Sequence, residues 1–409
     1  MGKVGNPAME FKFETQGKEK EEKEEKEEVK KETSIQGKEE IDMGMPKVDV
    51  EEFKIPQDAE DEIKDESEGA LKVGIMGGGQ CGGRIVESFY ALGYKKALVY
   101  NTTAQDSCSI PNFLDLKIEG QPGGAGKNMK VAEQALRDHE DEVYNEMTRI
   151  FGQVDHILVC AGLGGGTGGG TIRGVLELGK RYMKYIGWED PEKRVGAVVT
   201  LPTAGEANSP IVSANAYDMG TALSEMADKE EISPLIVVDN DKVKKLYAGL
   251  TIAKFFPTIN NTIAQLFHVF NWISQGESQF VTFDSTDFMT VLKCGGHLIM
   301  GVTVVEDYKA KTGISSALRS NLTKTLLATD FDLKTAKVAA VVTVVGKKIT
   351  EEVEGLMDNI EYGFDTIANF TGKAIVHRGI YADEERDNVC VYTMISGLSA
   401  PTKRYDRLR

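Results

Sequence analysis

Residues 161–171 read Ala-Gly-Leu-Gly-Gly-Gly-Thr-Gly-Gly-Gly-Thr. An apolar run that ends at Cys160 precedes them and a helix-like stretch over 172–185 follows, so the pattern predicts a strand, a glycine loop and a helix start. Seven glycines in eleven residues leave no Cβ to obstruct a ligand, so backbone amides and the positive end of the helix dipole can converge on an anion. A flexible linker is the alternative, but linkers do not normally join a buried strand to an apolar helix. We therefore expect a phosphate-binding loop, with Thr167 as the hydroxyl inside it.

From residue 71 onward, short apolar segments alternate with glycine-rich turns and amphipathic helices. This alternation is typical of an α/β fold with a doubly wound, mostly parallel sheet, in which ligands bind at the carboxyl ends of the strands. The expected strands cover residues 71–76, 97–100, 156–160, 195–200 and 235–238. Each ends at a polar or glycine-rich loop, so these loops should converge on one site.

A long central helix is predicted over 256–274, because apolar residues recur there at three- and four-residue spacing. We expect this stripe to be core; it consists of Ile263, Leu266, Phe267, Phe270 and Ile273. Strands at 298–305, 338–345, 374–381 and 389–395 then alternate with helices at 315–328 and 351–370, which predicts a second, smaller α/β domain. The expected units are a disordered acidic tail (1–69), a first domain (70–255), the central helix (256–280), a second domain (281–400) and a short C-terminal tail (401–409).

The composition excludes several function classes. The 409 residues are 41% hydrophobic and 27% charged, and no apolar run is long enough to span a bilayer. No secretory signal is recognisable, so the protein is expected to be cytoplasmic. The five cysteines form no CxxC pair and the five histidines show no ligand spacing, so neither a disulfide framework nor a protein-bound metal is expected. A net charge of −16 argues against direct nucleic-acid binding.

Most of the negative charge lies in the first 70 residues. They contain 23 acidic and 12 basic residues, and so carry −11 of the net charge of −16. Residues 18–31 are nearly all Glu and Lys, with helical i,i+4 pairs but no apolar face to bury. We interpret the segment as a solvated tether. Short apolar islands at 11–13 and 48–55 leave open a second interpretation, the docking of an adaptor or other partner.

Another glycine loop follows the first expected strand. Gly77, Gly79 and Gly82 fit the GxGxxG pattern of dinucleotide-binding folds. An NAD site needs an acidic residue about 20 positions further on, where this chain has the polar segment 101–105. A dehydrogenase would also leave the loop at 162–170 unexplained. The chain has no Walker motif with its phosphate-binding lysine either.

Taken together, the loops identify a family. Residues 79–85 (Gly-Gln-Cys-Gly-Gly-Arg-Ile) resemble the first nucleotide loop of tubulins, and residues 162–170 resemble the signature shared by tubulin and the bacterial division protein FtsZ. Four more segments follow in the family order, similar to the second loop (101–105), the γ-phosphate loop (120–126), the ribose loop (200–206) and the loop before the central helix (239–242). The resemblance covers about residues 71–400. It implies a tubulin/FtsZ-like fold, a GTP-binding domain at 70–255, a GTPase-activating domain at 281–400, and GTP or GDP with nucleotide-bound Mg²⁺ as ligands.

The resemblance also implies roles for the loop residues. Glycines and Thr167 would bind phosphates, Glu206 the ribose, and Asn240 and Asn261 the base, because an amide offers a donor and an acceptor to a purine edge. The resemblance puts Asn260 on the helix Asn of FtsZ and Asn261 on its base-binding Asp. A polar first turn of a helix is the alternative for Asn260 and Asn261. The expected nucleotide-binding residues are Gly79, Gln80, Cys81, Gly82, Gly83, Asn101, Gly124, Gly164, Gly165, Gly166, Thr167, Gly168, Glu206, Asn240, Asn260 and Asn261.

Two acids form the expected catalytic pair. Residues 282–291 resemble the FtsZ catalytic loop, with Asp284 and Asp287 on the two family acids. Three-residue spacing puts both carboxylates on one side of a turn or helix start. In the family these acids enter the active site of the neighbouring subunit, so head-to-tail stacking would couple hydrolysis to assembly. Helix capping is the alternative for both residues.

The chain departs from the family pattern at three places. Pro210 stands where FtsZ has an arginine, and Gly83 where both families have an asparagine, so the nucleotide contacts made there are expected to differ. The chain ends eleven residues after Leu398, without the tail by which FtsZ reaches membrane adaptors, which weighs against a standard division-ring role.

The leading hypothesis is a tubulin/FtsZ-type GTPase that polymerises head to tail and hydrolyses GTP at subunit junctions. One alternative is a nucleotide-binding regulator or scaffold of another filament with little GTPase activity. Another is a TubZ-like filament that positions plasmid or phage DNA. Division, DNA positioning and cell-shape control share the same chemistry and stay open at this point.

Overall fold

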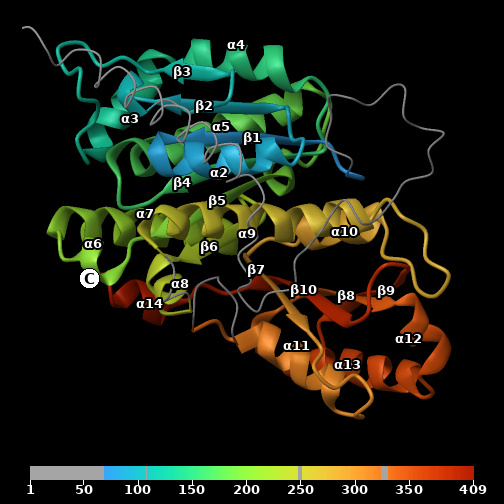
Figure 1. Cartoon of the computed structure of the whole chain (residues 1–409). Coiled ribbons are helices and arrows are strands. Elements are labelled where there is room, and N and C mark those ends of the chain that lie inside the picture. Colours follow the sequence, from blue (N-terminus) through green and yellow to red (C-terminus); the bar gives the residue numbers. More distant parts are fainter. Residues whose placement is uncertain (1–68, 107, 247–250, 324–329) are drawn as a thin grey trace, which may run out of the picture. The chain divides into compact units, whose positions relative to one another are not determined.

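The computed structural model describes residues 69–106, 108–246, 251–323 and 330–409. The expected acidic tail lies outside these residues up to position 68, and so does the end of the helix expected at 315–328. The described residues form one mixed sheet of ten strands in the order β3-β2-β1-β4-β5-β6-β7-β10-β8-β9. In the view of Figure 1 the long helix α9 crosses the middle of the fold.

Each strand expected from the sequence is present, with ends shifted by a few residues, and β3 is an addition. The strands are β1 (Val73–Gly78), β2 (Ala97–Asn101), β3 (Phe113–Asp115), β4 (His156–Gly162), β5 (Val195–Leu201), β6 (Leu235–Asp239), β7 (His297–Val304), β8 (Val338–Gly346), β9 (Ile375–Asp383) and β10 (Val389–Leu398). Strands β1 to β6 pair in parallel. Strand β10 is antiparallel to both β7 and β8, so the second half of the sheet is mixed.

The helices connect these strands. They are α2 (Gly79–Ala91), α3 (Met129–Asp138), α4 (Glu140–Phe151), α5 (Gly166–Tyr185), α6 (Ala204–Ala207), α7 (Pro210–Asp228), α8 (Asn240–Leu246), α9 (Ile252–Ile273), α10 (Ser285–Leu292), α11 (Gly313–Thr323), α12 (Lys347–Glu352), α13 (Leu356–Phe370) and α14 (Thr402–Asp406), with short 3₁₀ turns η3 (Ala104–Asp106), η4 (Pro191–Arg194) and η5 (Leu333–Thr335). None of the helices in the described ranges combines the length and the apolar character that a bilayer crossing needs.

Alternate residues of the central strands enter two separate cores. On β4, Leu158 and Cys160 pack with α2 and α9, whereas Val159 and Ala161 pack with α4, α5 and α7. Successive side chains of a strand point to opposite faces, so a strand that is apolar at every position is buried on both. The α/β, doubly wound fold expected from the sequence is therefore confirmed for the first half.

Helix α9 joins the two halves. Its predicted stripe is buried and belongs to the same core as the inward side chains of β7, β8 and β10. The prediction of a stripe that serves as core is confirmed. The second half also contains the predicted α/β elements, but the prediction of one continuous helix over 351–370 is wrong. This segment is split into α12 and α13 because Gly355 adopts a left-handed conformation (φ 73°) between them.

The last nine residues include α14, and the side chains of Arg404, Tyr405 and Leu408 are buried. Tyr405 packs against Gly220 of α7, where a Cβ would lie 2.7 Å from the tyrosine ring. The segment 401–409, expected as a short C-terminal tail, packs against the first half of the fold through these buried side chains.

Three buried histidines make the stability of the fold sensitive to acid. Burial lowers the pKa of His156 to about 3 and the pKa values of His268 and His297 to about 4, and the charges of Arg194 and Lys293 add to the shift at His156. The unfolded chain therefore binds protons that the native protein does not bind. The contribution of these neutral histidines to the free energy of unfolding is fully present above about pH 6.5. It is lost as the pH falls toward 4, by up to about 1.4 kcal/mol per pH unit for each histidine.

We expect the urea midpoint of unfolding to fall markedly between pH 7 and pH 5.5. His268→Gln should flatten this slope, since it removes one of the three groups and an amide can still pair with the hydroxyl of Tyr94. Equal midpoints at the two pH values would contradict the assignment of neutral buried histidines.

Candidate functional site

A cavity of about 610 Å³ lies at the carboxyl ends of the parallel strands. The loops after β1, β2, β4, β5 and β6 all contribute to its wall, together with residues 123 and 125–127 and the first half of α9. The strand order reverses between β1 and β4, and this switch point is where doubly wound sheets bind their ligands. The two glycine loops follow these two strands, so both reach the cavity.

Two helices begin at the cavity with glycine. Helix α2 starts at Gly79 after Gly78, and α5 starts at Gly166 after Gly165, and no described side chain caps either helix. By contrast, Asn128 caps α3 and Thr203 caps α6 through side-chain oxygens. The first N–H groups of α2 and α5 are thus left for a ligand, and the positive ends of both helix dipoles favour an anion.

Three of the predicted glycines are required by the packing of the chain around them. A Cβ on Gly82 would lie 2.2 Å from the carbonyl oxygen of Cys160, and one on Gly83 would lie 3.2 Å from Val99. Gly124 adopts a left-handed φ of 73° against Thr102. These three glycines were predicted to bind phosphate, yet they do not line the cavity. Gly82 and Gly83 instead allow α2 to approach β4 and β2.

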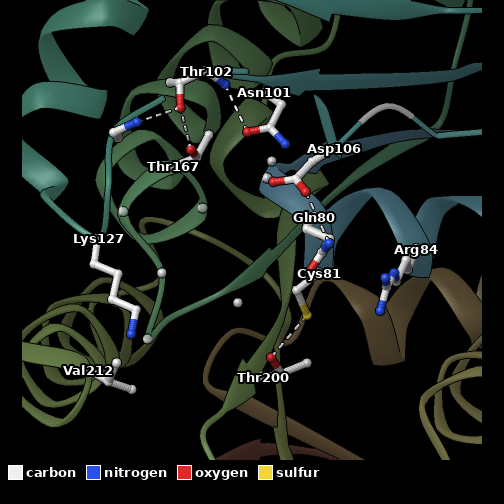
Figure 2. Close-up of a pocket in the computed structure, with 18 of the residues that line it drawn as sticks. Gln80, Cys81, Arg84, Asn101, Thr102, Asp106, Lys127, Thr167, Thr200 and Val212 are labelled. Carbon is white, nitrogen blue, oxygen red and sulfur yellow. Dashed lines mark hydrogen bonds between the residues drawn. The ribbon is translucent and has the colours of Figure 1, made fainter. Parts of the chain in front are cut away.

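A hydroxyl joins three of the loops. Oγ1 of Thr102 lies 2.7 Å from Oγ1 of Thr167 and accepts a hydrogen bond from the amide of Ala125 at 3.1 Å (Figure 2). The loop after β2, the loop at 120–126 and the glycine loop are therefore held together. On the other side, Sγ of Cys81 lies 3.2 Å from Oγ1 of Thr200. Burial raises the pKa of the Cys81 thiol, which keeps it neutral.

Two basic side chains also line the cavity. Figure 2 shows Lys127 extending along the glycine loop beside Val212, while Arg84 projects from α2 on the other side. Neither has an acidic partner within ion-pair distance among the residues that the structure describes. Lys127 has a left-handed φ of 68°, and its carbonyl oxygen accepts a hydrogen bond of 2.9 Å from Nδ2 of Asn215. The backbone is thus fixed while the ammonium group can meet a bound anion.

The loops after β5 and β6 and the first half of α9 carry the predicted nucleoside contacts, and we call their part of the cavity the nucleoside end. The part lined by the glycine loops after β1 and β4 is called the phosphate end. Glu206, Asn240 and Asn260 line the nucleoside end, and Oε2 of Glu206 accepts hydrogen bonds from the amide and hydroxyl of Thr203 at 2.8 and 2.9 Å. Asn261 does not line the cavity. Its Oδ1 instead accepts a hydrogen bond of 2.7 Å from Ser88 of α2. The resemblance gave Asn261 as the base contact, whereas the residue of this pair that lines the cavity is Asn260.

The two predicted catalytic acids lie outside the cavity lining of their own chain. Asp284 is the N-cap of α10, and its Oδ1 accepts hydrogen bonds from the amides of Thr286 and Asp287 at 2.8 and 2.9 Å. Asp287 completes a capping box with the amide of Asp284. Its Oδ1 also accepts a hydrogen bond of 2.6 Å from Nδ1 of His377 on β9. The capping alternative is thus realised, and it fixes both carboxylates at one exposed turn.

Known proteins resemble this chain over most of its length. A family model, described as the C-terminal domain of the tubulin-like protein TubZ, matches residues 281–402. TubZ of Bacillus cereus is 24% identical over 339 residues, which cover 76% of this chain and 74% of that protein. Cell division protein FtsZ 1 of Thermococcus kodakarensis is 26% identical over 365 residues, which cover 87% of this chain and 89% of that protein. The chain belongs to the tubulin/FtsZ superfamily.

Solved structures share the superfamily fold with this chain. A GTPγS-form protofilament of TubZ from Bacillus thuringiensis serovar israelensis superposes with a TM-score of 0.70 at 18% identity, covering 83% of this chain and 91% of that one. CetZ2 of Haloferax volcanii, in a GTPγS-bound protofilament, gives a TM-score of 0.67 at 22% identity and covers 83% and 98%. These likenesses confirm the expected tubulin/FtsZ-like fold.

Most of the site residues expected from the superfamily pattern meet in the cavity. They are Gly79, Gln80, Cys81, Asn101, Gly164, Gly165, Gly166, Thr167, Gly168, Glu206, Asn240 and Asn260. The sequence analysis missed Arg84, Asp106, Lys127, Val212 and Phe256, which also line it. A basic residue directly after each of two glycine segments was the available signal for Arg84 and Lys127. No comparable signal marked Val212 or Phe256.

Proposed function

We propose that this protein is a GTPase that assembles head to tail into filaments and hydrolyses GTP where two copies meet. The observation that carries the proposal is the pair of uncapped, glycine-started helices α2 and α5 at one cavity. Their free N–H groups suit a polyphosphate, and Lys127 and Arg84 add compensating positive charge. The TubZ and CetZ2 structures that share this fold are protofilaments, which supports the filament part of the proposal.

The polar groups of the cavity fit a nucleoside triphosphate. The glycine loops and the hydroxyl of Thr167 would hold phosphates, Glu206 would accept ribose hydroxyls, and the amides of Asn240 and Asn260 would contact the base. Nε2 of Gln80 donates a hydrogen bond of 3.1 Å to Oδ1 of Asp106, and this carboxylate would offer oxygen ligands of the kind that Mg²⁺ prefers. A nucleotide-bound Mg²⁺ would offset phosphate charge there.

Hydrolysis would need a second copy of the chain. Asp284 and Asp287 do not line the cavity of their own chain, so their carboxylates would reach a nucleotide only across a junction between subunits. There they would orient or polarise the attacking water. Carboxylates near a triphosphate are unfavourable without counter-charge, so delivering them only on assembly separates nucleotide binding from turnover. Localisation in the cytoplasm and adaptor binding by the N-terminal segment stay predictions.

Concentration dependence tests this proposal. Phosphate release per subunit should rise steeply above a critical protein concentration, together with light scattering that appears with GTP and not with GDP. The reason is that a half-site on each subunit turns over only at a junction. ATP in place of GTP tests the base preference that Asn240 and Asn260 are expected to set.

A constant rate per subunit at all concentrations would contradict the trans mechanism. Binding of GTP with almost no turnover, at concentrations where scattering is absent, would instead favour a nucleotide-binding regulator or scaffold. Scattering with GTP alone does not separate division from DNA positioning, since both use the same polymer chemistry.

A further inference from the structure

Helix α14 returns from the second half of the fold to the loops that follow β5 and β6. It follows β10, the strand between β7 and β8, and Figure 1 shows it beside α8. The hydroxyl of Tyr405 accepts a hydrogen bond of 3.1 Å from Ser224 of α7, and the carbonyl oxygen of Leu408 accepts one from Ser213. The end of the chain is therefore fixed on the first half through side chains that are almost fully buried.

Arg404 places its guanidinium group between two loops of that half. Its Nε and Nη2 donate to Oδ2 and Oδ1 of Asp239 at 2.6 and 2.8 Å, and Nη2 also contacts the carbonyl oxygen of Pro202 at 3.3 Å. The exposed fractions of Arg404 and Asp239 are only 5% and 3%. A two-point contact of this kind fixes orientation as well as distance, which a single-point lysine contact does not.

The groups that Arg404 joins are next to the cavity. Asp239 is the last residue of β6 and pairs in register with Leu201, the last residue of β5. The residues that follow these strand ends, Asn240 and Pro202, both line the cavity. One buried guanidinium group thus sets the spacing of the two adjacent loops that form its nucleoside end.

A second contact reinforces the same pair of loops. Oδ1 of Asp241 accepts a hydrogen bond of 3.2 Å from the amide of Ala204, the first residue of α6. The side chain of Asp241 is more exposed than that of Asp239, and it forms an ion pair with Lys245 at the surface. The buried pair is therefore the stronger constraint, because water does not compete for its hydrogen bonds.

We propose that Arg404 is a positioning residue for the nucleoside end of the cavity, acting through Asp239 and Pro202 on Asn240 and Glu206. The inference depends on the proposed nucleotide binding and extends it. The phosphate end follows β1 and β4, and no hydrogen bond or ion pair joins it to α14 among the described residues. Loss of the two-point contact should consequently weaken recognition of the nucleoside and leave recognition of the phosphates unchanged.

The experiment uses the full chain and the variants Arg404→Lys, Asp239→Asn/Arg404→Gln and Lys403→Ala. Arg404→Ala is avoided because it would leave a buried carboxylate without a partner. Arg404→Lys keeps the charge but loses the two-point contact, and the double variant replaces the ion pair by neutral amides. Lys403 is exposed on the same helix and is the matched control. Competition against a fluorescent GTP analogue gives the affinities of GTP and of inorganic tripolyphosphate.

The expected result is a loss of GTP affinity of about tenfold in Arg404→Lys and in the double variant, with the affinity of tripolyphosphate within twofold of wild type. Lys403→Ala should match wild type for both probes. Unchanged GTP affinity in the two Arg404 variants would overturn the inference. An equal loss for both probes would also overturn it, since general loosening of the fold would affect the phosphate end too. Failure of the wild-type protein to bind GTP would refute the proposed function instead.

Discussion

Asp284→Asn and Asp287→Asn are expected to bind GTP as the wild type does and to lose at least about a hundredfold in turnover. Neither side chain lines the cavity of its own chain, so binding should not change. Asparagine keeps the side-chain oxygen that caps α10 and removes only the negative charge, so the local fold should persist. Steady-state phosphate release and equilibrium GTP binding measure the two effects separately. Because GTP would remain intact at the junctions, filaments of these variants should also persist longer.

Asp332→Asn is the matched control for the acid variants. Its side chain also caps a helical turn, η5, by accepting a hydrogen bond of 3.0 Å from the amide of Lys334. The same chemical change there should leave turnover within twofold of wild type. Wild-type turnover in Asp284→Asn would refute the proposed catalytic role, and weakened GTP binding would show that the acids act within their own subunit.

The sheet could be predicted well from sequence because its strands are buried on both faces. Apolar runs such as 156–160 leave no other location for these residues, and glycine or polar residues mark where each run ends. The run 113–115 was missed because it is short and each of its residues is only half-buried. The break at Gly355 was missed because a glycine within an otherwise helical pattern does not by itself reveal a positive φ.

The candidate site was less predictable at the level of single residues. Asn260 and Asn261 are neighbours on one helix and point about 100° apart, so the choice between them depends on how α9 is rotated against α2. The sequence pattern also does not distinguish a glycine that lets a ligand approach the backbone from a glycine that lets two segments of the chain pack closely. Gly165 and Gly82 lie in similar glycine-rich segments, but a Cβ on Gly165 would have its nearest neighbour at 3.7 Å, whereas one on Gly82 would lie 2.2 Å from the carbonyl oxygen of Cys160.

Gly165→Asp is expected to abolish nucleotide binding, with a loss of at least about a hundredfold in GTP affinity, while leaving the nucleotide-free fold as stable as wild type or more so. Gly165 precedes α5 with an extended backbone (φ −87°, ψ 165°), and its Cβ would meet no atom closer than 3.7 Å. The new carboxylate would cap α5 itself and occupy the N–H groups that a phosphate needs. Calorimetric GTP binding and thermal unfolding without nucleotide measure the two opposite effects. Gly165→Ser, an uncharged cap, should give a smaller loss of affinity.

Gly82→Ala provides the opposite outcome, a lower melting temperature, because its Cβ would lie 2.2 Å from the carbonyl oxygen of Cys160. If Gly165→Asp is stable and binds GTP normally, the N-terminus of α5 is not part of the nucleotide site.

If Gly165→Asp fails to bind GTP as expected, it still carries both intact acids, whereas Asp287→Asn carries an intact cavity. A mixture of these two proteins should then release phosphate faster than the sum of each alone, because one junction type combines both intact halves. The absence of such recovery at assembling concentrations would contradict a site divided between two subunits.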